Sequence, residues 1–389
     1  MPAPLPSGSS RRAILIVAIT AIALETALLG LIAPLLPEIE RRTGAGDAAL
    51  GLALAAYAMP IVVVSIPTGR LADRIGRRPL LLGGLALTGA GSLLIAFSSS
   101  LGVLLVGRAV QGLGSTGSWI AALALVSDLA RPGRKGEAIG FALAANSFGA
   151  IAGPALGGIV GGGISFEAPF LAVAGIAAAM IAAGVLVLPR AGGERADRTA
   201  EPTALGMLGR PTVLVPAAVA VAGAAFIGMI DFTVPLDLDR RFGTAATTIG
   251  LLFAGAALLD AFASPIAGRS GDRRGRWPVV IAGAFVIGVA GLVLAAAGSV
   301  PGATLGLALF GIGTSIVFAA AVPWLDEGFG EGDRGLAYGG LNLVFAIGYT
   351  GGPLLGGGLL AAGSADAAYL VMAVVGLSGG LALLASRSR

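Results

Sequence analysis

Long apolar stretches, repeated along almost the whole chain, constrain its fold more than any other feature. About 20 apolar residues in a helix suffice to cross the hydrocarbon core of a bilayer. Twelve such stretches can be placed in the 389 residues: 13–36, 49–69, 79–98, 101–128, 136–161, 166–188, 212–236, 246–268, 278–299, 302–325, 335–362 and 367–385. The sequence therefore predicts an all-α membrane protein with twelve transmembrane helices.

Composition supports this class and excludes several others. Only 12% of the residues are charged, about half the share of a soluble globular chain. The chain has no Cys and no His, which removes disulfides, thiolate or imidazole metal sites and imidazole acid–base chemistry. We expect no metal and no cofactor. The basic residues lie in short loops beside apolar stretches, so we expect a lipid bilayer as partner and no nucleic acid.

The basic residues also predict orientation. If odd-numbered spans begin on the inside, 20 of the 25 basic residues lie on that side, 4 lie on the other, and Arg108 falls within a span. Cytoplasmic loops carry the excess of Lys and Arg in multi-pass proteins. We therefore expect a cell-membrane protein with both termini in the cytoplasm.

An internal repeat with an offset of 199 residues organises the chain. The loop Gly69–Pro79 (GRLADRIGRRP) meets Gly268–Pro278 (GRSGDRRGRWP), and Arg41-Arg42 meets Arg240-Arg241. Each half holds six spans, so the repeats are parallel and related by an axis normal to the membrane. We expect an N-terminal six-helix bundle at 1–188, a cytoplasmic linker at 189–211 and a C-terminal six-helix bundle at 212–389.

Four motifs resemble those of the major facilitator superfamily, and within it the twelve-span drug:proton antiporters. They are Gly69-x-x-x-Asp73-x-x-Gly76-Arg77-Arg78, Arg108-x-x-Gln111-Gly112-x-Gly114, Gly149-x-x-x-Gly153-Pro154-x-x-Gly157-Gly158 and Pro34-x-x-Pro37. The resemblance covers nearly the whole chain. It implies two bundles that expose a central site to each side of the membrane in turn.

The loop between spans 2 and 3 is the most specific of these motifs. In the family that it resembles, this loop latches the two halves in the outward-open state, which implies a latch of Gly69, Asp73, Arg74, Gly76 and Arg77. We expect close packing at Gly69, a left-handed turn at Gly76 and an ion pair between Asp73 and Arg77. The acidic loop 326–333, or the N-terminal dipole of span 11, is the expected partner. An ordinary basic loop with turn residues is the alternative.

Ionisable residues inside spans are candidates for proton coupling, because a charge is expensive to hold there. Four qualify: Glu25, Arg108, Asp231 and Asp260. A carboxylate held away from bulk water can load and release protons. Glu25 is the first choice, with the alternatives that it is a static partner of Arg108 or binds a cationic substrate. Asp231 could instead reach the outer interface.

Polar and aromatic residues on helix faces suggest a substrate cavity. Gln111 and Ser115 share a face with Arg108, because they follow at spacings of three and four. The cavity candidates are Gln111, Ser115, Asn146, Tyr338, Asn342, Phe345 and Tyr349. An aromatic and amide-lined wall suits amphipathic ligands, although helix packing explains the stripe on span 11 equally well.

Small residues and prolines mark helix contacts that could permit movement. The candidates for packing and gating are Pro34, Gly149, Gly153, Pro154, Gly157, Gly352 and Pro353. Glycine at every fourth position allows close helix approach, and proline loosens a helix locally. Static packing is one interpretation. A smooth contact between spans 5 and 8, or 2 and 11, is the other.

The sequence thus predicts a secondary active transporter that exports a small amphipathic or apolar, drug-like molecule in exchange for protons. The alternatives are a sugar or metabolite exporter or symporter of the same fold, and a non-transporting membrane sensor or scaffold. We expect no enzyme activity and a monomer. Gly112-x-Gly114-x-x-Gly117 fits a dinucleotide motif but lies within a span with no preceding strand, so we expect no nucleotide.

Overall fold

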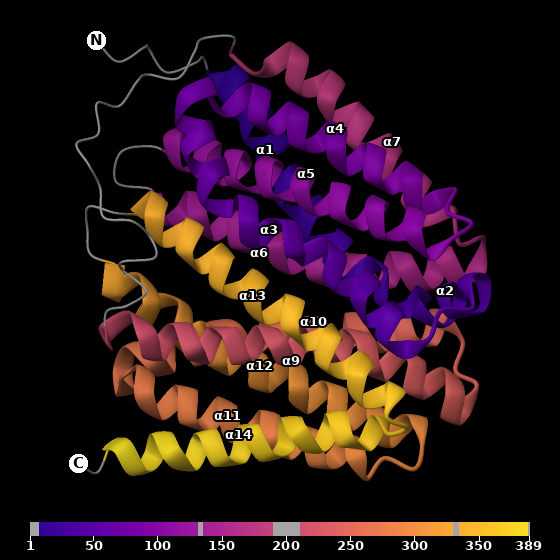
Figure 1. Cartoon of the computed structure of the whole chain (residues 1–389). Helices are drawn as coiled ribbons and strands as arrows, with labels where there is room; N and C mark the ends of the chain where they lie inside the picture. Colours follow the sequence, from indigo (N-terminus) through magenta and orange to yellow (C-terminus); the bar gives the residue numbers. More distant parts are fainter. Residues whose placement is uncertain (1–7, 131–134, 190–210, 330–333, 388–389) are drawn as a thin grey trace.

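The computed structural model describes residues 8–130, 135–189, 211–329 and 334–387. All regular elements in these residues are helices, as predicted (Figure 1). The first half contains α1 (Gly8–Leu31), η1 (Ala33–Leu35), α2 (Leu36–Thr43), α3 (Asp47–Ile75), α4 (Arg77–Ala96), α5 (Leu101–Asp128), α6 (Lys135–Leu156), η2 (Gly157–Gly161) and α7 (Ala168–Val187). The second half contains α9 (Pro211–Phe242), α10 (Ala246–Arg274), α11 (Arg276–Ala295), α12 (Val300–Phe329), α13 (Arg334–Ala361) and α14 (Ala365–Arg387).

Twelve helical segments of the described chain are long and apolar enough to cross a membrane, which confirms the predicted number. The first of them is interrupted. Pro34 lies in the short 3-10 turn η1, which separates α1 from α2, because proline cannot donate the next helical hydrogen bond. The repeat-related α9 runs without such a break to Phe242, beyond the predicted end at 236.

The helices form two bundles that lie one above the other in Figure 1. Most of the first bundle's core is one cluster of buried apolar residues, and most of the second bundle's core is another. A small separate cluster joins Ala58 of α3 to Ala224 of α9 and Tyr349 of α13, and therefore lies between the bundles. The midplane between the two halves is thus packed in this state.

Two closely packed helix pairs join the bundles, and the repeat relates them. Gly51 of α3 faces Pro353 and Gly357 of α13, while Gly250 of α10 faces Pro154 and Gly158, where α6 passes into η2. The offset of 199 residues maps each pair onto the other. At both places a Cβ in place of the glycine hydrogen would overlap the carbonyl oxygen of the facing proline. Spans 2 and 11 and spans 5 and 8 therefore meet backbone to backbone.

The predicted glycine stripes face their own bundles instead. A Cβ on Gly149, Gly153 or Gly157 would overlap carbonyl oxygens of α1. Gly352 packs in the same way against Ala225 of α9. The stripes therefore hold each bundle together, and the adjoining face with Gly158 and Gly357 makes the contact between bundles. The sequence pattern alone did not separate these two faces.

We expect Gly250→Ala to loosen the contact between α6 and α10. The added methyl group would have to displace backbone atoms of the facing helix, and such overpacking destabilises by about 1–3 kcal/mol. The measurement is the midpoint of thermal unfolding in detergent, which should fall by several degrees. Gly255→Ala is the matched control, because the same helix leaves open space there. Equal midpoints for the two variants would contradict the assigned contact.

Candidate functional site

A buried carboxylate lies in the first bundle and is held by hydroxyl groups. Glu25 of α1 is 2% exposed. Thr88 of α4 donates a hydrogen bond to it at 3.0 Å, and Ser118 of α5 donates one at 2.5 Å. Three helices therefore fix the carboxyl group. Hydroxyl groups can serve either protonation state, because they donate to a carboxylate and accept from a carboxylic acid.

Arg108 of α5 is wholly buried near this group. Its Nη1 donates to the side-chain oxygen of Gln111 at 3.1 Å and lies 3.5 Å from the backbone oxygen of Leu28. The guanidinium carbon lies 4.5 Å from the centre of the Tyr57 ring. A cation over an aromatic face is stabilised by the ring's electrons, which offsets part of the desolvation of the charge.

The idea that Glu25 is a static ion-pair partner of Arg108 is wrong for this state. Among the described residues, the carboxylate bonds to hydroxyl groups and the guanidinium bonds to Gln111, with no ion pair between them. Tyr57 lies beside both, since its hydroxyl donates to Ser115 at 2.7 Å and lies 3.4 Å from the backbone oxygen of Glu25. The two charges are thus held separately.

A second buried carboxylate lies in the other bundle. Asp231 of α9 is 9% exposed and accepts a hydrogen bond from the Tyr349 hydroxyl at 2.9 Å. The alternative that Asp231 reaches the outer interface is therefore wrong. Tyr349 belongs to the cluster between the bundles and is close enough to Arg108 for electrostatic interaction. Tyr349 thus links Asp231 of the second bundle to the cluster between the bundles.

Asp260 of α10 is set apart from these groups. Its side chain is half-buried beside Thr314 of α12, and its backbone oxygen accepts a hydrogen bond from the Ser315 hydroxyl at 2.9 Å. These contacts stay within the second bundle. Of the four predicted proton-coupling residues, Glu25 and Arg108 both lie beside Tyr57 in the first bundle, and Asp231 bonds to Tyr349 in the cluster between the bundles. Asp260 forms no described hydrogen bond with any of them.

The predicted cavity residues divide between the two bundles. In the first, Gln111 links Arg108 to Ser92, and Asn146 accepts a hydrogen bond from Thr26, the neighbour of Glu25. In the second, Phe345 stacks on Tyr349 with ring centres 5.8 Å apart and approaches Phe318 at 6.2 Å. The predicted amide and aromatic wall is therefore continuous with the charged residues.

One residue of that wall bridges the bundles directly. Asn342 of α13 donates a hydrogen bond to Ser65 of α3 at 3.2 Å. The side chain of Tyr338, also predicted to line the cavity, lies outside the described residues. The contact of α3 with α13 therefore extends from Gly51 and Gly357 through Ala58 and Tyr349 to this polar pair.

The predicted latch is only partly described. Gly76 has φ +88°, a positive value that favours glycine, as does its repeat partner Gly275 at +85°. No described atom lies within 4 Å of a Cβ built on Gly69, so the expected close packing there is absent. The side chain of Asp73 and those of the acidic loop 326–333 lie outside the described residues.

Other contacts of this loop are clear. Arg77 forms an ion pair of 3.1 Å with Asp128 at the end of α5, and Arg74 is exposed. In the second copy of the loop, Arg276 pairs with Asp272 at 2.8 Å, with the spacing of four predicted for Asp73 and Arg77. The loop therefore contacts its own bundle through Arg77.

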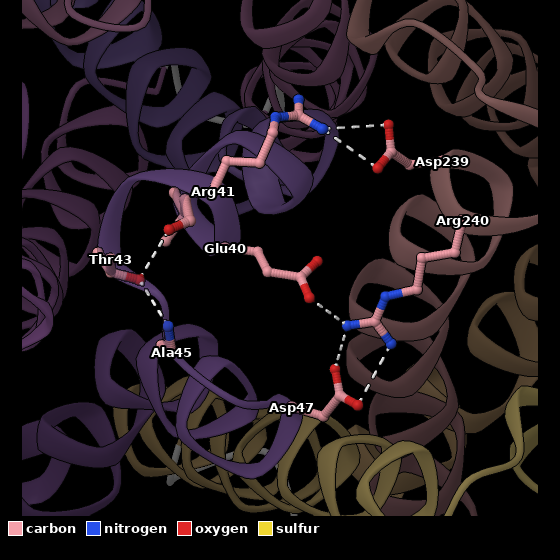
Figure 2. A network of polar contacts seen from close by, with 8 residues as sticks. Glu40, Arg41, Thr43, Ala45, Asp47, Asp239 and Arg240 are labelled. Carbon is pink, nitrogen blue, oxygen red and sulfur yellow. Dashed lines mark hydrogen bonds and ion pairs between the residues drawn. The ribbon is translucent and has the colours of Figure 1, made fainter.

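An ionic network joins the bundles at the end that carries α2 (Figure 2). Arg41 of α2 pairs with Asp239 of α9 at 3.2 Å. Arg240 of α9 pairs in turn with Glu40 at 2.6 Å and with Asp47 at 2.5 Å. We call these five residues the clasp. The beginning of α1 and the end of α14 lie at the opposite end of the molecule (Figure 1).

Among the described residues, the neighbouring arginines, Arg42 and Arg241, form their ion pairs within their own bundles. Arg42 binds Glu38 at 2.9 Å and Glu167 at 2.7 Å, and its hydrogen bond lowers the pKa of Glu167 below the usual value. Arg241 likewise pairs with Asp237 and Asp366. Arg42 and Arg241 thus lie beside the clasp without joining the two bundles.

Sequence reasoning used these arginines for orientation and as marks of the repeat, and missed the clasp. A signal was present, because the offset of 199 residues also relates Glu38 to Asp237, Glu40 to Asp239 and Glu167 to Asp366. No comparable signal marked Tyr57, Thr88 and Ser118. Single hydroxyls are common in membrane helices and become informative only when the fold places them around Glu25.

Comparison with known proteins agrees with this architecture. The family model described as Major Facilitator Superfamily matches residues 15–236 and 216–389. Tetracycline resistance protein, class C, of Escherichia coli is 31% identical over 69% of this chain and 70% of its own length. The inner membrane transport protein YajR of Escherichia coli (strain K12) is 40% identical, over 38% of this chain and 32% of that protein.

A solved structure supports the fold over the full length. It is the crystal structure of a bacterial homolog to the human lysosomal transporter Spinster, in an inward-facing and occupied conformation. It superposes with a TM-score of 0.79 at 17% identity and covers 99% of this chain and 98% of that chain. With twelve spans in two repeat-related bundles and a family model matched across almost its whole length, the chain belongs to the Major Facilitator Superfamily.

Proposed function

We propose that the chain is a proton-coupled antiporter that exports a small amphipathic or apolar, drug-like molecule by alternating access. The observation that carries the proposal is the placement of Glu25, a buried carboxylate held by the hydroxyls of Thr88 and Ser118 beside the interface between bundles. An intramembrane carboxylate without a fixed cation can exchange its proton when the surrounding helices move. The similarity to a tetracycline resistance protein supports export of a drug-like molecule.

We further propose which side of the membrane each end faces. The excess of basic residues places both termini in the cytoplasm, so the clasp end would face outward. The state described here would then be closed to the outside, with the clasp and the pairs Gly51–Gly357 and Gly250–Gly158 as its outer barrier. The two bundles, 1–188 and 212–389, would move as units about these contacts. The linker 189–211 would join them, and the transporter would act as a monomer.

Residue roles follow from the same geometry. Glu25 carries the proton, and Asp231 with Tyr349 is the matching acidic group across the interface. Asp260 is the third candidate. Gln111, Ser115, Asn146, Asn342, Phe345 and Tyr349 line the substrate path between them.

The test is substrate-driven proton movement in proteoliposomes that contain the purified chain. Lipophilic cations, lipophilic anions, neutral drugs and sugars are added in turn while the internal pH is recorded. We expect amphipathic compounds to drive proton movement and sugars to have no effect. A response to one sugar and to no amphipathic compound would contradict the proposal and favour a sugar transporter of the same fold.

The latch between spans 2 and 3 remains a prediction from the family resemblance. We expect Asp73→Asn to reduce transport sharply at unchanged expression, because the latch would stabilise the opposite, outward-open state. Asp272→Asn at the repeat-related position is the matched control, since Asp272 pairs within its own loop. Normal transport by Asp73→Asn would rule out the latch.

A further inference from the structure

We propose that Arg108 is the anchor for an acidic substrate: the exported molecule carries a carboxylate, or a similar planar anion, on an apolar body. This inference deepens the proposed function and rests on it, because it names the substrate class of the same interface. The structural basis is the edge of the guanidinium group that the protein leaves without a partner.

The protein uses only one end of the guanidinium. Nη1 is the nitrogen that meets Gln111 and Leu28. In the described part of the chain, Nε and Nη2 have no hydrogen-bond partner, although both atoms are buried. Leaving a buried donor of a charged group unpaired is costly, so such donors in a native structure call for an explanation, and a bound anion would supply one.

The two unpaired atoms form the edge that suits a carboxylate. Nε–H and the adjacent Nη2–H of an arginine point in parallel, and this fork accepts the two oxygens of one carboxylate. Arginine stays charged at any physiological pH, so the site is cationic throughout the cycle. The acids nearby are otherwise engaged, since Glu25 bonds to Thr88 and Ser118 and Asp231 bonds to Tyr349.

The surroundings suit an apolar body attached to that anion. The Tyr57 ring covers one face of the guanidinium. Tyr349, Phe345 and Phe318 of the second bundle form a run of aromatic rings in contact with Ala224 and with Ala58, the chain neighbour of Tyr57. A flat aromatic acid could therefore reach Arg108 from the first bundle and the rings from the second. The midplane is packed in the present state, so the ligand would enter when the bundles separate.

The experiment compares three probes that share one apolar body: 2-naphthoate, 2-naphthamide and 2-naphthylmethylammonium. Binding to the full-length chain in detergent is measured by titration calorimetry, so the readout does not depend on transport. We expect the carboxylate to bind about ten- to a hundred-fold more tightly than the amide, because it makes charged hydrogen bonds to the fork. Equal affinities, a preference for the ammonium or no binding of the carboxylate would overturn the proposal.

Two variants test the fork itself. Arg108→Lys keeps the charge but lacks the two parallel N–H donors. It should bring the ratio of carboxylate affinity to amide affinity close to one. Gln111→Glu places a carboxylate beside Arg108 and should lower the affinity for 2-naphthoate, which provides a second test if the lysine variant fails to fold. Arg42→Gln removes an arginine that pairs with Glu167 beside the clasp. It should leave the ratio of carboxylate to amide affinity unchanged.

Failure of this inference can be told apart from failure of the proposed function. If amphipathic compounds drive proton movement but 2-naphthoate has no advantage over 2-naphthamide, the antiporter proposal stands and the acidic substrate class falls. If Arg108→Lys loses proton coupling while its carboxylate preference is retained, Arg108 acts on the proton and the anchor proposal is overturned.

Discussion

In the double variant Arg41→Gln/Arg240→Gln, the clasp end should open about 5- to 30-fold more often than in the natural chain. The two substitutions remove all three ion pairs between bundles in the clasp. Exposed pairs contribute little, and the Arg41 side chain is 56% exposed, so each pair is worth well under 1 kcal/mol, or about 1–2 kcal/mol together. Because these pairs exist only in the closed state, their loss shifts the equilibrium between states.

The measurement is the rate of thiol labelling at a cysteine introduced at Ala246→Cys, which lies against Gly158 and Gly162 of the other bundle and leaves the clasp residues unchanged. Arg42→Gln is the matched control, because Arg42 has the same charge and helix but pairs only with Glu38 and Glu167 of its own bundle. It should leave the labelling rate near that of the natural chain. The clasp would not be a gate if the double variant and this control label equally.

Glu25→Gln should abolish accumulation of substrate against its gradient, with a loss of at least about tenfold, while binding persists. The amide keeps the size of the side chain and can still accept hydrogen bonds from Thr88 and Ser118, so the bundle should fold. It cannot release a proton. Transport driven by a proton gradient should therefore fail, while exchange of labelled for unlabelled substrate across the membrane continues.

Asp231→Asn and Asp260→Asn separate the candidate acids. Asp231→Asn removes the acceptor of the Tyr349 hydrogen bond at the interface, whereas Asp260→Asn changes a half-buried side chain within the second bundle. Both should retain part of the proton-driven accumulation. If Glu25→Gln accumulates substrate normally and one aspartate variant does not, that aspartate is the proton carrier.

The sequence alone predicted the all-helical fold, the number of spans and the division of the chain into two repeated halves. These follow from strong physical constraints, since a bilayer demands about 20 apolar residues per span and a repeat keeps one offset. It also selected Glu25, Arg108, Asp231 and Asp260 as candidates, because charges inside apolar stretches are conspicuous. Their partners were less visible. Helix rotation decides whether Glu25 meets Arg108 or the hydroxyls of Thr88 and Ser118, and sequence spacing along separate helices does not specify it.

The glycine motif shows the same limit. Gly149, Gly153 and Gly157 were expected at a helix contact, and they do make one, but with α1 of their own bundle. Gly158, one position further along, faces Gly250 of the other bundle. Neighbouring helix positions differ by about 100° in direction. A shift of one residue along the helix therefore changes a contact within one bundle into a contact between the two bundles.

The most direct measurement of alternating access is a pair of distances between spin labels on α7 and α14. The chain has no cysteine, so introduced thiols are the only labelling sites. Leu171 and Leu370 report the clasp end, and Leu186 and Leu384 report the opposite end; all four side chains are exposed. In the double variant Arg41→Gln/Arg240→Gln, the first distance should lengthen and the second should shorten, relative to the otherwise natural chain. Two distances that both stay fixed, or that change in the same direction, would contradict alternating access.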